Sequence, residues 1–165
     1  QDNQFKVKIN DIFMNIDTTS SVTPGTINWI KEDEIVKISF LDTKGNLPER
    51  SGLNWGQREN REPNQAYLSL KKDSRKEGFL PQKKFTFTML TDDGTSLDCV
   101  VQQQSRKGVS TTYDNSILGK YIRNRIGVRE GELIKSNDLI KYGRTDFTLK
   151  KIDDENFLFD FSIEK

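Results

Sequence analysis

Residues 85–101, FTFTMLTDDGTSLDCVV, have the pattern of a β-hairpin. Apolar and polar side chains alternate on both sides of a short turn, as in strands that bury one face. The turn is Asp92-Asp93-Gly94, where glycine accepts the positive φ that hairpin turns require. This hairpin predicts an antiparallel sheet around the middle of the chain.

Further strand patterns lie on both sides of this hairpin. They occur at 5–9, 34–41, 66–70, 146–152 and 157–163, and Leu133–Ile134 resembles the start of another. The last two full strands face each other across Asp153–Asn156, and Phe157, Phe159 and Phe161 share one face that we assign to the core. The pattern predicts about seven strands, mostly antiparallel, that close into a barrel.

The spacing of apolar residues predicts one α-helix. Its apolar face consists of Ile117, Leu118, Tyr121, Ile122 and Ile126. Asp114 or Asn115 can cap its start, and Gly127 ends it. Arg123 and Arg125 then fall on its polar face. A charged connection at 71–78 has the composition of a short second helix.

The amino-acid composition limits the classes of protein to which this chain can belong. The chain has 165 residues, enough for one domain, and only 33% of them are hydrophobic, although ten are Phe. No apolar run is long enough to span a membrane, and no signal peptide is visible. The single cysteine, Cys99, cannot form an internal disulfide, which favours a reducing compartment, and we expect it to be buried on a strand. The chain begins at Gln1, so we expect residues 1–30 to be a linker to a missing domain and 31–165 to be the folded domain.

The absence of histidine limits the chemistry. It removes Ser–His–Asp and Cys–His catalysis and most zinc sites, and no phosphate-binding glycine loop is present. A metal-dependent nuclease stays open as an alternative, because Asp42-Thr43-Lys44 follows a strand and Asp33 lies upstream. The neighbouring Gly45-Asn46 also fits a plain turn.

Charge is unevenly distributed. The formal net charge is +1, yet residues 50–125 hold fourteen Lys or Arg against eight Asp or Glu, a balance of +6, and the rest of the chain balances at −5. A basic middle segment is typical of a polyanion-binding protein, although an ordinary solvated surface gives the same count.

Two polar loops carry the side chains that match DNA bases. The first lies in RSGLNWGQRENREPNQAYLSL (50–70), where Gly52 and Gly56 are expected to keep the backbone pliable, and the second is QQQSRKGVSTTY (102–113). Arg can bond guanine through two atoms, and Asn or Gln can do the same for adenine. Alternatives remain: Trp55 as a packing residue, Arg58 and Arg61 paired with Glu59 and Glu62, or a barrel that binds protein.

Several long motifs resemble one known family. They are GLNWGQRxxREPNQAYLSL, FLP, FTxxTDDG, DNSILGKYIRNRIG and DLxxYGRTDFTLxKI. Together they resemble the C-terminal DNA-recognition domain of NgoFVII/NgoAVII-type restriction endonucleases, from Ile35 to the end of the chain. The resemblance implies a B3-like DNA-binding pseudobarrel, a mainly β (α+β) fold with seven strands and two short helices in an open barrel.

The resemblance also implies a site of two loops that grip the DNA major groove. An N-arm falls at Ser51–Arg61 and a C-arm at Gln104–Tyr113. The expected N-arm contacts are Ser51, Asn54, Trp55, Gln57, Arg58, Asn60 and Arg61. The expected C-arm contacts are Gln104, Ser105, Arg106, Lys107, Thr111, Thr112, Tyr113 and the adjoining Asp114. Phosphate contacts are expected from Lys71, Lys72, Lys83 and Lys84.

In that family, cleavage belongs to a separate phospholipase D-like nuclease domain that uses a histidine. This chain has no histidine. We therefore expect a sequence-specific reader of double-stranded DNA from a bacterial, cytoplasmic restriction endonuclease, with no catalytic residue, metal or cofactor of its own. Its other expected partner is the nuclease domain of the same parent chain.

Overall fold

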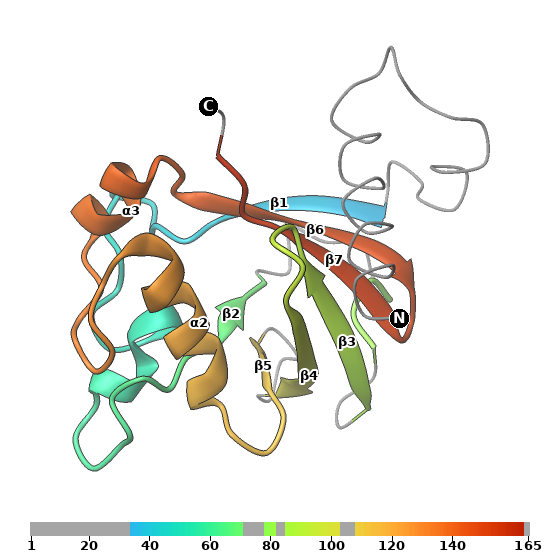
Figure 1. The fold of residues 1–165 in the computed structure, drawn as a ribbon, viewed down its shortest axis with the longest axis horizontal. Helices are drawn as coiled ribbons and strands as arrows, with labels where there is room; N and C mark the ends of the chain where they lie inside the picture. Colours follow the sequence, from blue (N-terminus) through green and yellow to red (C-terminus); the bar gives the residue numbers. More distant parts are fainter. Residues whose placement is uncertain (1–33, 71–77, 82–84, 103–107, 164–165) are drawn as a thin grey trace.

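The computed structural model describes residues 34–70, 78–81, 85–102 and 108–163. Within these ranges, one curled sheet of seven strands is flanked by short helices (Figure 1). The strands are β1 (Ile35–Ser39), β2 (Leu68–Ser69), β3 (Thr86–Thr91), β4 (Ser96–Gln102), β5 (Gly108–Thr111), β6 (Asp146–Asp153) and β7 (Asn156–Asp160). The helices are the 3-10 helix η3 (Gly52–Gln57) and the α-helices α2 (Ser116–Ile126) and α3 (Ser136–Tyr142). The predicted pseudobarrel with two short α-helices is confirmed.

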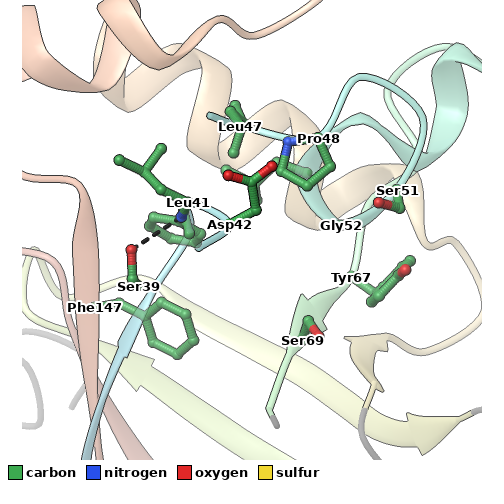
Figure 2. A pocket seen from close by; sticks show the side chains of 12 residues that line it. Ser39, Leu41, Asp42, Leu47, Pro48, Ser51, Gly52, Tyr67, Ser69 and Phe147 are labelled. Carbon is green, nitrogen blue, oxygen red and sulfur yellow. Dashed lines mark hydrogen bonds between the residues drawn. The ribbon is translucent and has the colours of Figure 1, made fainter. Parts of the chain in front are cut away.

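The sheet has the order β1-β6-β7-β3-β4-β5-β2. Every pairing is antiparallel except that of β3 with β7, which is parallel and places Met89 opposite Phe157. Strands β1 and β2 are the two edges. A pocket of about 120 Å³ lies where these edges face each other, with Ser39 of β1 on one side and Ser69 of β2 on the other (Figure 2). The barrel is therefore open along this seam.

Aromatic side chains fill the inside of the curled sheet. Phe157, Phe159 and Phe161 are all 0% exposed, so the predicted core stripe is confirmed. The ring of Phe159 stacks against Phe147 with centroids 5.4 Å apart. Cys99 is buried on β4 as predicted, and burial raises the pKa of its thiol well above the ordinary value. Among the described helices, none is both long and apolar enough to cross a membrane.

Two segments differ from the sequence prediction. The segment 108–111 was expected in a polar loop, but it forms β5, whose four residues are buried because β4 and β2 pair with it on both sides. Leu133–Ile134 is not a strand but leads into α3, because the Ile134 backbone is bonded by a side chain, that of Asn54. The predicted strand at 5–9 and the connection at 71–77 lie outside the described residues.

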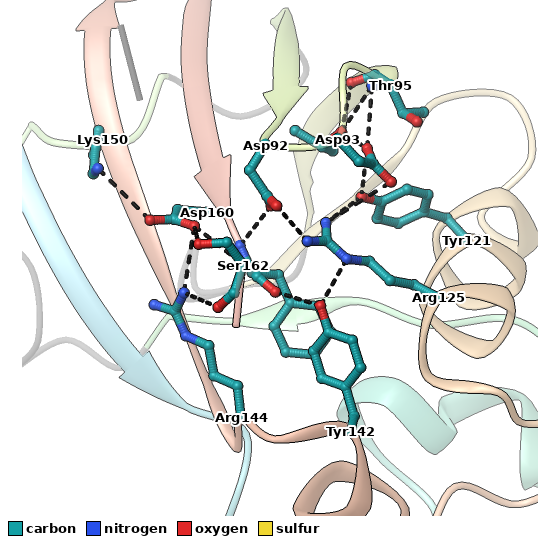
Figure 3. Close-up of polar contacts among 12 residues, drawn as sticks. Asp92, Asp93, Thr95, Tyr121, Arg125, Tyr142, Arg144, Lys150, Asp160 and Ser162 are labelled. Carbon is teal, nitrogen blue, oxygen red and sulfur yellow. Dashed lines mark hydrogen bonds and ion pairs between the residues drawn. The ribbon is translucent and has the colours of Figure 1, made fainter. Parts of the chain in front are cut away.

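Helix α2 matches its prediction in extent, and Gly127 ends it with φ 82. The expectation that its arginines occupy a polar face is wrong. Arg125 pairs with Asp92 in the β3–β4 turn and donates to the hydroxyls of Tyr121 and Tyr142 (Figure 3). Asp92 in turn accepts the Phe161 backbone N–H at 2.8 Å. This network ties α2 to the central hairpin and to the end of the last strand.

Candidate nucleic-acid interface

The N-arm is a compact folded turn rather than a pliable loop. Most of it is η3, and the chain then folds back so that Gly56 N–H donates to the Gln65 carbonyl at 2.8 Å. A Cβ on Gly56 would lie 2.3 Å from the Glu62 carbonyl oxygen. Glycine is therefore required at position 56 because two backbone segments touch there, and the expectation of a pliable backbone is corrected.

Asn54 lies inside the protein and not on the exposed face of the N-arm. It is 0% exposed, and its side-chain amide donates to the carbonyls of Pro48 at 2.9 Å and Ile134 at 2.8 Å. Its oxygen accepts the Ile134 N–H at 2.9 Å. The expected base contact of Asn54 is thus replaced by a role in joining the N-arm to the segment before α3.

Trp55 and Arg61 form a stack at the edge of the N-arm. The guanidinium carbon of Arg61 lies 3.9 Å from the centre of the Trp55 ring, and Trp55 packs edge-on against Tyr67 at 5.5 Å. Arg61 Nη1 also donates to Gln65 Oε1 at 2.9 Å. Half-buried Trp55 therefore has the packing role that the sequence left open, and it fixes the plane of an exposed arginine.

Three more N-arm side chains lie around this stack. Arg58 is exposed and donates from Nε to the Arg50 carbonyl at 2.7 Å. Asn60 is exposed at the tip, with φ 65, a conformation that Asn tolerates better than most residues. Gln57 is less available, because its amide nitrogen bonds the carbonyls of Pro63 at 3.0 Å and Gly131 at 3.3 Å. Ser51, at the start of the arm, lines the seam pocket (Figure 2).

The two exposed arginines are not neutralised by their neighbours in sequence. Within the part of the chain that the structure describes, neither Arg58 nor Arg61 forms an ion pair. The Glu62 carboxylate instead accepts from the backbone and side-chain nitrogens of Asn64, both at 2.9 Å. The N-arm therefore presents two cations with donor groups that face solvent.

A buried arginine binds the backbone of the segment that follows the N-arm. Arg123 of α2 is 0% exposed and donates to three backbone carbonyls, those of Glu132 at 2.9 Å, Gly119 at 3.2 Å and Pro63 at 3.4 Å. Burial lowers its pKa, and the charge of Glu62 opposes that change. The sequence pattern did not predict this role, because it assigns the helix position of Arg123 to the solvent-facing side.

Part of the C-arm lies outside the described residues, namely Gln104, Ser105, Arg106 and Lys107, as do Lys71, Lys72, Lys83 and Lys84. In the described part, most side chains bond within the protein. Thr111 is buried and donates to the Asp114 carbonyl at 2.7 Å, and Thr112 donates to the Asp98 carbonyl at 3.2 Å. Asp114 accepts from the Ser116 hydroxyl and N–H, bonds that lower its pKa and cap α2. Of these four residues, Tyr113 and Asp114 are exposed.

The N-arm and the described end of the C-arm lie at the same end of the molecule. Figure 1 shows the loop after η3 and the loop between β5 and α2 both at the lower end of the view, with α2 above them. The segments that follow the two loops are joined by a hydrogen bond, since Ala66 N–H donates to the Asn115 carbonyl at 3.1 Å. One rigid unit therefore carries the N-arm and the loop between β5 and α2.

Asp42-Thr43-Lys44, the triplet that suggested a metal-dependent nuclease, forms a turn. Asp42 Oδ1 accepts the backbone N–H groups of Lys44 and Asn46, both at 2.9 Å, which is the Asx-turn arrangement. Asp33 lies outside the described residues. Across the residues that are described, no cluster of three or more His, Cys, Asp or Glu side chains is placed to hold a metal ion.

A curled seven-stranded sheet of this kind, with few short helices, is the architecture of a B3-like pseudobarrel. The model of one family, the NgoFVII C-terminal B3-like DNA-binding domain, matches residues 28–153, and the chain belongs to that family. The resemblance seen in the sequence motifs is thereby confirmed, and DNA is the binding partner that the family assigns. No curated protein matches the chain.

Proposed function

We propose that this chain reads a specific sequence of double-stranded DNA through the major groove, using the N-arm and the C-arm, and that it does not cut DNA. One observation supports the proposal: the N-arm and the loop between β5 and α2, where the C-arm ends, lie at one end of the barrel and are joined by a hydrogen bond between Ala66 and Asn115. Two loops on one rigid base can enter one groove together, because neither has to be ordered separately on binding.

The N-arm supplies the base contacts that we consider strongest. Arg58 and Arg61 are exposed and form no ion pair among the described residues, and Asn60 is exposed between them. Arginine matches the O6 and N7 atoms of guanine, and asparagine matches the N6 and N7 atoms of adenine. The stack of Arg61 on Trp55 favours Arg61 further, because less side-chain freedom is lost when it binds.

The remaining contacts are proposed from the sequence and the family. Gln104, Ser105, Arg106 and Lys107 would approach the bases from the C-arm, with Thr112 and Asp114 at its foot. Lys71, Lys72, Lys83 and Lys84 would meet phosphates, which fix the position on DNA without reading its sequence. The parent protein would be a bacterial restriction endonuclease whose nuclease domain lies outside this chain.

A pair of matched variants tests the proposal on a duplex chosen by the chain from a random pool. Arg58→Ala should weaken binding to that duplex by about 1–3 kcal/mol and relax the preference at one base pair. Lys37→Ala removes an exposed positive charge from β1, where Lys37 pairs with Asp146, and should leave the preference unchanged. Equal loss in both variants would contradict base reading by the N-arm. Cleavage of duplex DNA by the chain in magnesium would contradict the non-catalytic part.

A further inference from the structure

Tyr113 has an unusual backbone for a large side chain. It lies between β5 and α2 with φ 65, in the left-handed region that favours glycine. Asp114 N–H donates to the Thr112 carbonyl at 2.6 Å, so the chain reverses direction around Tyr113 alone. A non-glycine residue in this conformation raises the energy of the folded state, and such strain concentrates at functional positions.

Among the described residues, the side chain of Tyr113 makes no contact that would offset this strain. It is exposed to 106% of its reference surface, and within the described residues it makes no hydrogen bond and no ring contact. A tyrosine with a strained backbone is normally stabilised by packing of its ring or by a hydrogen bond of its hydroxyl. This one is strained and unpacked, which points to a contact made only when a partner is bound.

The turn beneath Tyr113 is held rigidly. Thr112 donates both its N–H and its hydroxyl to the Asp98 carbonyl, at 2.9 and 3.2 Å. On the other side, Asp114 accepts two bonds from Ser116 and receives the Thr111 hydroxyl on its carbonyl. The backbone at Tyr113 is therefore held in place before any partner arrives, while the exposed ring can rotate about its side-chain bonds.

The surroundings of the ring indicate which part of DNA it meets. Tyr113 borders a shallow groove that also contains Asp98 and Glu155. Two exposed carboxylates disfavour a phosphate at this position, because like charges repel. The flat face of a base carries no charge, and aromatic side chains stack on any base.

We propose that Tyr113 is a wedge that stacks on a base at one step of the bound duplex and locally separates that base from its neighbour. The inference rests on the proposed function, since it places the duplex against the end of the barrel that carries the N-arm and the loop between β5 and α2. It adds a contact that reads the ease of opening a base step rather than a pattern of hydrogen bonds.

The test uses the 165-residue chain and the duplex that it selects, with 2-aminopurine placed at successive positions. This base fluoresces more strongly when its neighbour no longer stacks on it. The wild type and Tyr113→Phe should both raise the fluorescence at one step. Tyr113→Ala should bind roughly tenfold more weakly and should not raise it at saturation. Ile140→Ala removes another exposed apolar side chain, on α3, and serves as the control.

The outcomes separate this inference from the function on which it rests. Selective binding with unchanged fluorescence at every step would overturn the wedge and leave sequence reading intact. A fluorescence rise that Tyr113→Ala retains would also overturn it. Failure to select any duplex would overturn both. Tyr113→Gly, which relieves the positive φ, should be at least as stable as Tyr113→Ala, so a loss of fluorescence in the glycine variant cannot come from unfolding.

Discussion

Gly119 of α2 lies directly against the backbone of Asn64 at the foot of the N-arm. A Cβ built on Gly119 would be 1.7 Å from the Asn64 carbonyl oxygen and 2.9 Å from Nη1 of Arg123. The helix and the arm therefore touch backbone to backbone, and only glycine permits this approach. The side chain of Asn64 extends the same contact, because its oxygen accepts the Gly131 N–H.

Gly119→Ala should lower the free energy of unfolding by about 3 kcal/mol, because a backbone atom must move to admit the methyl group. At an ordinary helix position the same change would stabilise the protein by about 1 kcal/mol. Urea unfolding gives the value. Gly45→Ala, at a turn with open space but φ 82, should lose only about 1 kcal/mol, so a smaller loss at Gly119 than at Gly45 would contradict the contact.

Asn54→Ala should destabilise the domain by about 3 kcal/mol. The change leaves buried backbone groups of Pro48 and Ile134 without partners, and unsatisfied buried groups are costly. Chemical unfolding of this variant is compared with that of Asn137→Ala, which removes an exposed amide on α3. If Asn54→Ala kept full stability and lost only DNA binding, Asn54 would be a contact residue after all.

Asp92→Ala should cost about 3–5 kcal/mol of stability. The carboxylate bonds the largely buried Arg125 and the Phe161 N–H, and its removal leaves Arg125 with only the longer ion pair to Asp93 at 3.9 Å (Figure 3). Asp154→Ala breaks a pair with Lys151 in which the Asp154 side chain is 80% exposed, so it should cost less than about 1 kcal/mol. Similar midpoints for the two variants in urea would show that the Arg125 network does not hold α2 in place.

Acid should weaken the domain partly through Asp160. Burial alone raises the pKa of this carboxyl, but the Ser162 hydrogen bonds and the charges of Lys150 and Arg144 outweigh it and keep the pKa below the ordinary value of 3.8. A lowered pKa means that the charged form stabilises the fold above pH 3.8 and that this stability is lost as the pH falls toward the folded-state pKa.

The measurement is the free energy of unfolding between about pH 6 and pH 3. The Asp160→Asn variant should be less stable than the wild type at pH 6 and should lose less stability than the wild type on acidification. Asp98→Asn, which alters an exposed carboxyl, should follow the wild-type curve. Parallel curves for Asp160→Asn and the wild type would contradict the assignment.

The sequence predicted the parts of the fold that depend on local pattern. Alternation around Asp92–Gly94, the phenylalanine stripe at 157–161 and the glycine after α2 each report on burial or φ at their own positions, and the structure contains all three. The sequence motifs identified the family, and the resemblance to that family predicted the open barrel.

Long-range contacts account for what the sequence missed. Strand β5 has small and polar residues, and only its two neighbouring strands bury it. Asn54 and Arg123 have the chemistry of DNA contacts, but their partners lie in the segment 131–134 and on α2, which no pattern near them indicates. The exposed Arg58, Asn60 and Arg61 stay as predicted contacts, because no internal partner buries them.

Selection of bound duplexes from a random pool tests the central claim, that two arms on one rigid barrel read a DNA sequence. We expect the 165-residue chain to enrich one short site, and Arg58→Ala and Arg61→Ala each to relax a different base pair within it. Binding of all duplexes with equal strength, or enrichment of the same site by the wild type and both variants, would contradict it.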